Sequence, residues 1–165
     1  MPNNILVKYA TSATLTCAVG SLGSDTALID GVESSVIDNT TDGYDDYLIS
    51  GKVTVAASGL TTARLIEVFA VAWNGSAWPD VFDGTSSAVS ISSEEIKNSI
   101  CKPIAIMPTT ATASAVYHFS GVSLRQAFGG VLPSKCVLFV TQSTGAPLAA
   151  SGHEFRIQGV YPQVQ

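Results

Sequence analysis

Charged side chains are scarce in this sequence. They occupy 13% of its 165 positions, whereas an average soluble domain has roughly 25%. The eight Lys and Arg residues are scattered, and the 13 Asp and Glu residues leave a formal net charge of −5. A sequence-independent nucleic-acid binder needs clustered Lys and Arg to contact phosphates. We therefore expect no nucleic-acid partner.

Long apolar runs are missing as well. No segment approaches the ~20 consecutive apolar residues of a membrane-spanning helix. The opening MPNNILVKYATSATLT has no basic leader followed by an uninterrupted apolar stretch. We therefore expect a soluble protein that is made in a cytoplasm and has no membrane partner.

Metal-binding and disulfide patterns are also missing. Cys17, Cys101 and Cys136 are odd in number, widely spaced and without a C-x-x-C pair, which fits neither a disulfide framework nor a zinc site. His118 and His153 lack the helical spacing of a paired metal site. We predict three free, buried thiols, no metal and no cofactor.

Sequence motifs of catalysis do not occur. The chain has no G-x-S-x-G, no H-E-x-x-H and no phosphate-binding loop. Asp42, Asp45 and Asp46 lie near a glycine, but they lack the alternating spacing and the distal Glu of a calcium loop, which favours a solvated turn. A carboxylate pair for glycoside hydrolysis would form only in space, and no residue pattern nominates one. We predict that the protein is not an enzyme.

Glycine, proline and β-branched residues are abundant, and this composition favours short strands joined by tight turns. The clearest alternation runs from Tyr47 to Val55 and predicts a long amphipathic strand. One face of that strand carries Tyr47, Ile49, Val53 and Val55, and the other carries Leu48, Ser50, Lys52 and Thr54.

A hairpin is predicted in the middle of the chain. The apolar run from Arg64 to Trp73 is followed by Asn74-Gly75, the strongest short hairpin signal. The return strand is expected at Ala77 to Phe82, at a sheet edge because Pro79 interrupts it. From Ser92 to Ile100, a serine cap and two glutamates predict a short helix.

A second hairpin is predicted to close the chain. Its strands are Cys136 to Gln142, apolar on both faces and therefore central, and His153 to Tyr161, which alternates. Ser123 to Phe128 is expected to form one helical turn. Further strands are expected at Ile5 to Tyr9, Thr14 to Val19, Ala88 to Ile91, Ile104 to Met107 and Ala113 to Phe119. The pattern predicts an all-β, jelly-roll-like antiparallel β-sandwich in one domain over residues 1–165, without fixing the strand order.

Two surfaces are candidates for binding a partner. Trp73, Trp78 and Phe82 flank the Asn74-Gly75 turn and could form an aromatic platform for a sugar or a protein. Alternatively, one of these rings packs in the core and the others cover it. The second candidate is the outward strand face that carries Leu48 and Thr54.

Two segments resemble sequences of small structural proteins of tailed bacteriophages. In the first, Asp38-Asn39-Thr40-Thr41 precedes YLISGKV at 47–53, similar to the turn and tyrosine-containing element that lead into a strand in that family. In the second, AFGGVLPSK at 127–135 precedes an apolar strand, then TGAPL at 144–148 and a closing strand ending at 159–161. The resemblance spans most of the chain after about residue 30, but residues 92–101 depart from it.

The resemblance implies a non-enzymatic virion protein with a β-sandwich fold. It favours a capsid decoration (cement) protein that bridges and stabilises neighbouring major capsid subunits. Such proteins often occupy local threefold positions, which implies a homotrimer whose partner is the major capsid protein. The acidic charge suggests the outer surface of the capsid, away from packaged DNA. The alternative is a receptor- or carbohydrate-binding module of a tail fibre or spike.

Overall fold

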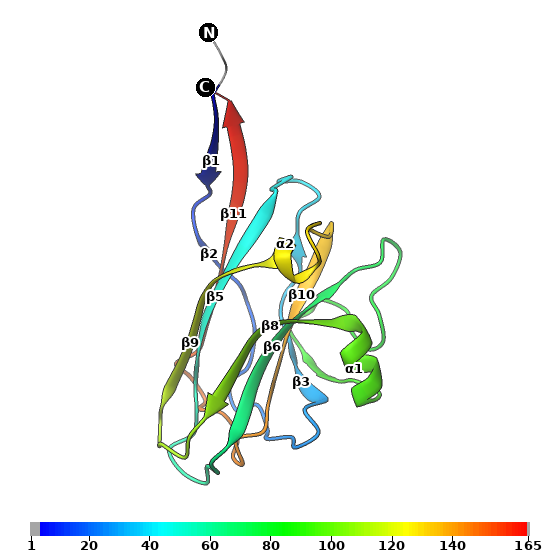
Figure 1. Ribbon diagram of the computed structural model, residues 1–165. Helices are drawn as coiled ribbons and strands as arrows, with labels where there is room; N and C mark the ends of the chain where they lie inside the picture. Colours follow the sequence, from blue (N-terminus) through cyan, green and yellow to red (C-terminus); the bar gives the residue numbers. More distant parts are fainter. Residues whose placement is uncertain (1–3, 165) are drawn as a thin grey trace.

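Two antiparallel sheets pack face to face in the computed structural model of the chain, which describes residues 4–164 (Figure 1). Sheet 1 has the order β1 (Ile5–Tyr9), β11 (Glu154–Val164), β5 (Asp46–Thr54) and β9 (Val116–Ser123), with β2 (Ala13–Thr14) also pairing with β11. Sheet 2 has the order β7 (Ala88–Ser90), β3 (Asp30–Glu33), β10 (Lys135–Gln142), β6 (Arg64–Ala72) and β8 (Cys101–Thr109), with β4 (Ile37–Asp38) also pairing with β10. The helices are α1 (Glu94–Ile100) and α2 (Leu124–Ala127).

The strand order is that of a jelly roll. The chain passes repeatedly from one sheet to the other, so that β5, β9 and β11 lie in sheet 1 while β3, β6, β8 and β10 lie in sheet 2. All named pairings are antiparallel. The predicted all-β, jelly-roll-like sandwich is therefore confirmed.

The main core lies between the sheets. The alternation predicted for the strand at 47–55 is confirmed, because Ile49 and Val53 are fully buried while Leu48 and Thr54 lie on the opposite face. From sheet 2, alternate residues of β6 and β10 point into the same core. Each buried side chain of this size contributes roughly 1.5–3 kcal/mol of transfer free energy. Its fully buried members include Phe155, Ile49, Ile66 and Leu138.

Sheet 2 is buried on its outer face too. Phe69, Phe139 and Phe82 form a second cluster there, with ring centroids of Phe69 and Phe139 6.3 Å apart and those of Phe82 and Phe139 5.6 Å apart. Side chains of α1 and of the segment 78–91 cover this cluster. The two buried faces explain why the run at 136–142 is apolar throughout, and the prediction that this strand is central is confirmed.

The predicted helix at 92–100 is confirmed as α1. Ser93 caps it, since its side-chain oxygen accepts a hydrogen bond from the Ile96 N–H at 3.3 Å. Helices this short are unstable alone, so tertiary contacts must hold it. Lys97 supplies one of these contacts, because its Nζ lies 3.1 Å from a carboxylate oxygen of Glu67 on β6. The predicted helical turn after Ser123 is confirmed as α2.

The predicted closing hairpin is wrong. The strands β10 and β11 form, but they belong to different sheets. The buried Gln142 side chain turns the chain at the end of β10: its Oε1 accepts a hydrogen bond from the Thr144 N–H at 2.6 Å, and its Nε2 donates to the carbonyls of Ala146 and Leu22. This network directs residues 143–153 across to sheet 1.

The predicted return strand at Ala77 to Phe82 is also wrong. The Asn74 turn closes, because Asn74 Oδ1 accepts from the N–H groups of Ser76 and Ala77. The chain then crosses the outer face of sheet 2, where Phe82 is 5% exposed. Burial of this ring outweighs strand pairing at a position where Pro79 lacks a donor.

The strand predicted at Thr14 to Val19 is shorter than expected. Only β2 (Ala13–Thr14) pairs with sheet 1, and Cys17 forms an isolated bridge with Ser34, next to the end of β3. This segment carries the chain between the sheets. Leu15 and Val19 of this segment are buried in the core, and Cys17 is half-buried.

Candidate interaction surfaces

The feature that stands apart from the sandwich is a two-stranded ribbon, formed by residues 5–9 of β1 and residues 160–164 of β11. It extends beyond the other strands, at the top of Figure 1. The antiparallel register pairs Ile5 with Val164, Val7 with Pro162 and Tyr9 with Val160. Directly paired residues project from the same face of a sheet. These six side chains therefore form one continuous face, which we call the apolar ribbon face.

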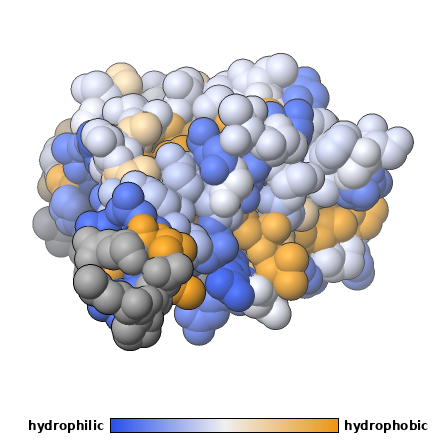
Figure 2. Space-filling view, turned by 90° about the horizontal axis from the view of Figure 1, so that it is seen from above, coloured by the Kyte–Doolittle hydropathy of each residue, from blue (hydrophilic) through white to orange (hydrophobic). Residues whose placement is uncertain are grey.

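The apolar ribbon face is open to solvent. Ile5 is 70% exposed, Val7 63%, Tyr9 59% and Val164 61%. Figure 2, which looks onto the molecule from above, shows hydrophobic surface in this region. An isolated two-stranded ribbon is marginally stable in water, and contiguous exposed apolar surface marks interaction sites. The ribbon is therefore the strongest candidate for a contact with another molecule.

The outer face of sheet 1 is a second surface, and it is polar. Leu48 and Thr54 lie on it, as predicted from the sequence, and both are half-buried. The Glu154 carboxylate bridges Arg156 at 3.0 Å and Lys52 at 3.3 Å. The hydrogen bond from Arg156, followed by the contact with Lys52, lowers the pKa of Glu154.

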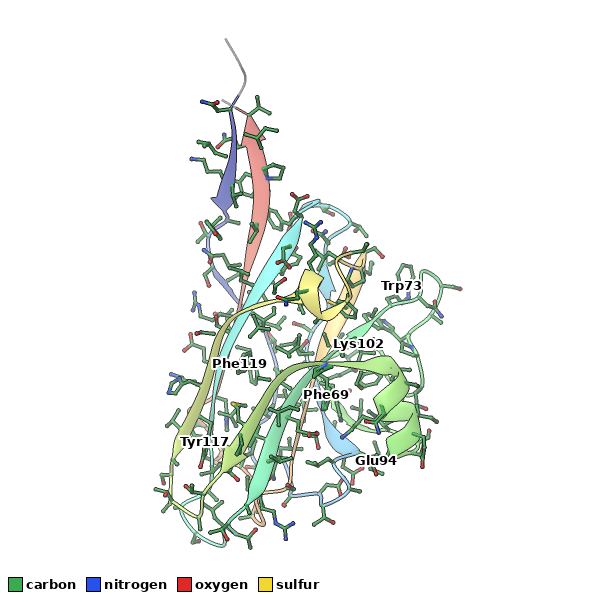
Figure 3. The ribbon with its side chains drawn as sticks, viewed as in Figure 1. Phe69, Trp73, Glu94, Lys102, Tyr117 and Phe119 are labelled. Atoms are coloured by element: carbon green, nitrogen blue, oxygen red, sulfur yellow. The ribbon has the colours of Figure 1, made fainter. Side chains whose placement is uncertain are left out.

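A shallow groove runs along this charged row. It has a volume of about 430 Å³ and is lined by Ser50, Lys52, His118, Phe119, Glu154 and Arg156. Phe119 contributes an aromatic ring that also packs towards Phe155 in the core, with centroids 6.2 Å apart (Figure 3). Polar groups of both signs beside an aromatic ring can bind a polar ligand such as a sugar.

The aromatic residues near the Asn74 turn have separate environments. Phe82 lies in the second core cluster, and Trp78 is half-buried against that cluster. Trp73, labelled in Figure 3 beyond the end of β6, lies under the Lys135 ammonium at 5.6 Å from Nζ to the ring centroid. One ring therefore packs in the core, as in the alternative above, and only Trp73 and Trp78 retain exposed edges.

The two buried carboxylates, Glu33 and Glu67, each join two parts of the fold. Glu33 is fully buried, and its carboxylate accepts hydrogen bonds from the backbone N–H groups of Asp83, Gly84 and Thr85 at 3.0–3.3 Å. Burial raises the pKa of Glu33. This contact fastens the covering segment 78–91 to β3. The partner of the other buried carboxylate, Glu67, is Lys97.

The acidic residues at 42–46 have different partners. Asp46 fixes the start of α2, since its carboxylate accepts hydrogen bonds from the Arg125 N–H at 2.8 Å and from the Ser123 hydroxyl at 2.6 Å. Asp42 lies 3.4 Å from the Tyr47 hydroxyl. Within residues 4–164 no three His, Cys, Asp or Glu side chains form a group that could hold a metal ion.

The two histidines lie apart on sheet 1 and its flanking loop. His153 is held between backbone groups, with Nε2 2.7 Å from the Ala149 carbonyl oxygen and Nδ1 3.3 Å from the Thr54 nitrogen. His118 is exposed on β9. The geometry thus gives His153 a structural role and places His118 at the groove.

The three cysteines carry free thiols, as predicted. Cys101 and Cys136 are buried, and Cys17 is partly buried. Burial raises the pKa of each thiol to about 12. Because the thiolate is the nucleophile, we expect these thiols to react slowly at neutral pH.

Sequence reasoning missed the ribbon as an interaction surface. The sequence predicted the strand Ile5 to Tyr9, but its pattern did not indicate that the side chains of Ile5, Val7 and Tyr9 are exposed. The signal was present, because the segment ILVKY has one charged residue and the segment VYPQV at 160–164 has none. Two such strands that pair with each other need a third element to bury their apolar side chains, and none covers this face among residues 4–164.

A scan against protein-family models found no match to this sequence, and a search of curated protein sequences found no match either. Among the residues that the structure describes, no helix is long and apolar enough to cross a membrane.

Proposed function

We propose that this protein is a non-enzymatic structural component of a tailed-bacteriophage virion: a capsid decoration (cement) protein that bridges and stabilises neighbouring major capsid subunits. The observation that carries the proposal is the apolar ribbon face, which projects from a sandwich whose own core is complete. A protein that acts by binding to capsid subunits needs an exposed apolar surface of this kind. The jelly-roll-like fold and the sequence resemblance support the same reading.

The interior of the sandwich supports a structural role. Glu33, Glu67, Lys97 and Gln142 are all buried, and each is engaged by hydrogen bonds or an ion pair that joins two parts of the fold. Catalytic sites characteristically hold ionisable groups in open clefts with strained or unbalanced surroundings. Here Glu33 holds the segment 78–91 against β3, and the ion pair of Lys97 with Glu67 holds α1 against β6. Gln142 fixes the connection that leads from β10 to β11.

The charge favours the outer surface of the capsid. With a net charge of −5, the protein would be repelled by packaged DNA, and it has no basic stripe to compensate. Antibodies against the protein should therefore bind intact, DNA-filled particles. Complete protection until the capsid is opened would contradict this placement.

The proposed assembly is a homotrimer at local threefold positions of the capsid, with the major capsid protein as the binding partner. Closed cyclic symmetry is the common solution for repeated identical contacts. The low charge leaves a neutral surface suited to such contacts. Light scattering of the purified protein measures the number of chains in the assembly, and a clean monomer at micromolar to millimolar concentration would contradict a trimer that forms without the capsid.

The decisive experiment adds purified protein to undecorated capsids. We expect co-sedimentation and a higher temperature of capsid disruption. The double variant Ile5→Ser with Val164→Ser should lose at least tenfold in apparent affinity, because it places polar groups on the apolar ribbon face. The control is Val131→Ser, since Val131 is 75% exposed and lies outside the ribbon. Equal binding by all three proteins would overturn the ribbon as the attachment surface, and no binding by any would overturn the cement function.

The groove on sheet 1 supports a second candidate, a receptor- or carbohydrate-binding module of a tail fibre or spike. Its mixed charges and Phe119 suit a polar ligand. The two functions differ in copy number. Quantitative mass spectrometry of purified virions should find hundreds of copies of a cement protein, but tens or fewer of a tail module.

A further inference from the structure

One backbone edge of β1 has no partner within the part of the chain that the structure describes. Ala10 N–H donates to the Gly159 carbonyl of β11 at 2.8 Å. Hydrogen-bonding direction alternates along an antiparallel strand, so Lys8 and Leu6 also point their backbone groups towards β11. The N–H and C=O groups of Ile5, Val7 and Tyr9 then point the other way. Among residues 4–164, β1 pairs with β11 alone, so these groups form an open edge.

The opposite edge of the ribbon is closed to pairing. Val160 C=O already accepts the Asp45 N–H at 2.8 Å, which shows that even-numbered residues of β11 face away from β1. Pro162 is the next residue with this orientation, and proline has no N–H to donate. Proline on an edge strand blocks the addition of another strand. The β1 edge has no proline, no bulge and no inward-pointing charge.

We propose that the β1 edge pairs antiparallel with the β1 edge of a second copy of this chain, about a twofold axis at Val7. In this register Val7 lies opposite Val7 of the second copy, and Ile5 lies opposite Tyr9. All the outward N–H and C=O groups of Ile5, Val7 and Tyr9 are then satisfied. The result is a continuous four-stranded sheet in the order β11, β1, β1, β11.

The side chains fit a second copy better than an unrelated strand. Ile5, Val7 and Tyr9 project from the same face in both copies, so the two apolar ribbon faces join into one of twice the width. An aromatic ring opposite a β-branched side chain is a favourable cross-strand pair. Lys8, the only charged residue of β1, lies opposite Leu6 on the other face, so that no like charges meet.

The shape of the molecule permits this contact. The ribbon extends beyond the sandwich (Figure 1), and antiparallel pairing therefore places the two sandwiches at opposite ends of the joined ribbons. Five residues from each copy are far fewer than the roughly 20–30 per side of a standard interface. We expect weak dimerisation in dilute solution and strong avidity when many copies are held on one particle.

This inference concerns the isolated protein and does not rest on the proposed function. On a capsid, the twofold contact would join copies that belong to neighbouring threefold positions. In either setting the broadened apolar face remains available for a further partner, because edge pairing uses backbone groups and leaves the faces of the ribbon free.

A pair of single-cysteine variants tests the register. In Val7→Cys, the new thiols lie opposite each other in a hydrogen-bonded pair, with Cα atoms about 5.5 Å apart, within the range that a disulfide spans. Mild oxidation should give a covalent dimer on a non-reducing gel. In Val164→Cys, on the same face and 61% exposed, the thiols would be separated by three strand spacings across the sheet, about 14 Å, and by four residues along it, about 13 Å, so no dimer should form.

The control also separates edge pairing from face-to-face packing of the ribbons. If the apolar faces packed directly against each other around an axis, Val164→Cys would cross-link as readily as Val7→Cys. That result, or the absence of a Val7→Cys dimer at millimolar concentration, would overturn the proposal. Of the native thiols, Cys101 and Cys136 are buried and Cys17 is half-buried, and oxidation of the original chain under the same conditions shows whether any of them cross-links.

A proline variant tests the role of the backbone. Val7→Pro removes an outward N–H but no hydrogen bond to β11, so the ribbon itself remains, as it does with Pro162 directly opposite. Sedimentation equilibrium should show loss of concentration-dependent association, with an unchanged circular dichroism spectrum and unfolding temperature. Association of Val7→Pro at the affinity of the original chain would contradict edge pairing. Both assays use the protein without capsids, so their outcome is separate from that of the capsid-binding test.

Discussion

The ammonium of Lys97 and the carboxylate of Glu67 form an ion pair 3.1 Å apart between α1 and the outer face of β6. Lys97 is 5% exposed and Glu67 8%. The ammonium also donates to the Leu28 carbonyl at 3.1 Å and lies 5.1 Å from the centroid of the Phe69 ring. The position of the helix over sheet 2 therefore depends on a charge that has little access to water.

Removal of one partner of this pair should destabilise the protein strongly. Lys97→Met leaves the Glu67 carboxylate buried and uncompensated, which costs about 3–5 kcal/mol. Urea denaturation measures the loss in the free energy of unfolding. The double variant Lys97→Met with Glu67→Leu should lose less than Lys97→Met alone. The control is Lys102→Met, at a half-buried position where Lys102 has no ion pair with any residue in the range 4–164. It should change the free energy of unfolding by no more than ~0.5 kcal/mol. A similar loss in both lysine variants would show that the pair has no special role.

The contact between Asp38 and Lys135 should make stability depend on pH. Hydrogen bonds from the Thr40 side chain and backbone, followed by the contact with Lys135 at 3.0 Å, lower the pKa of Asp38 to about 2 from its ordinary 3.8. Because the folded state has the lower pKa, the contribution is complete above pH 3.8 and is lost as the pH falls through about 2.

The variant Asp38→Asn tests this dependence. It should be less stable than the original chain at pH 6, and the difference in the free energy of unfolding should shrink as the pH falls from 4 to 2. Added salt should also reduce the difference, because the pair is exposed. A difference that stays constant from pH 6 to pH 2 would show that the carboxylate charge contributes nothing.

Gln142→Leu should be among the most damaging substitutions of a polar residue. Gln142 is fully buried, and Leu would leave the Thr144 N–H and the carbonyls of Leu22 and Ala146 with fewer partners. Each buried unsatisfied group costs about 1–3 kcal/mol, so we expect a total loss above ~3 kcal/mol. Gln126→Leu, on the exposed side of α2, is the matched control and should have little effect. The measurement is the thermal unfolding temperature of both variants, which should be much lower for Gln142→Leu. Equal unfolding temperatures would contradict this prediction.

The cysteines should be inert in the folded protein. At pH 8 a thiol reagent such as DTNB should not label Cys17, Cys101 or Cys136 until denaturant is added, because burial raises their pKa to about 12 and blocks access. Complete unfolding should release three reactive thiols. The variant Val131→Cys provides an exposed thiol that should react at once. Rapid labelling of any native cysteine would show that part of the sandwich opens easily.

The alternation of apolar and polar residues correctly predicted strands that have one face against the core. Tyr47 to Val55 could be placed as an amphipathic strand, and the both-sided apolar run at 136–142 could be placed at the centre of a sheet, because burial directly sets these patterns. The local helix signal at Ser93 also held, since capping depends on neighbours in sequence.

Pairing over long distances could not be predicted in the same way. The strands β10 and β11 are neighbours in sequence, yet each finds its partner in a different sheet, because the buried Gln142 network redirects the chain between them. Phe82 could not be assigned to the core from its local sequence, which equally fits a return strand. The apolar ribbon face could not be predicted because its residues come from β1 and β11, which are far apart in the sequence.

The pairing of β1 with β11 sets an order of events during synthesis. At about 5–20 residues per second, about 7–30 s pass between the synthesis of β1 and that of residues 154–164. Throughout that interval ILVKY has both edges open and no native partner in its own chain. On a polysome, where nascent copies are crowded, this segment is exposed to β1 of its neighbours, and its single lysine is the only charge that opposes premature aggregation. A chaperone that binds short apolar segments would find its first target there.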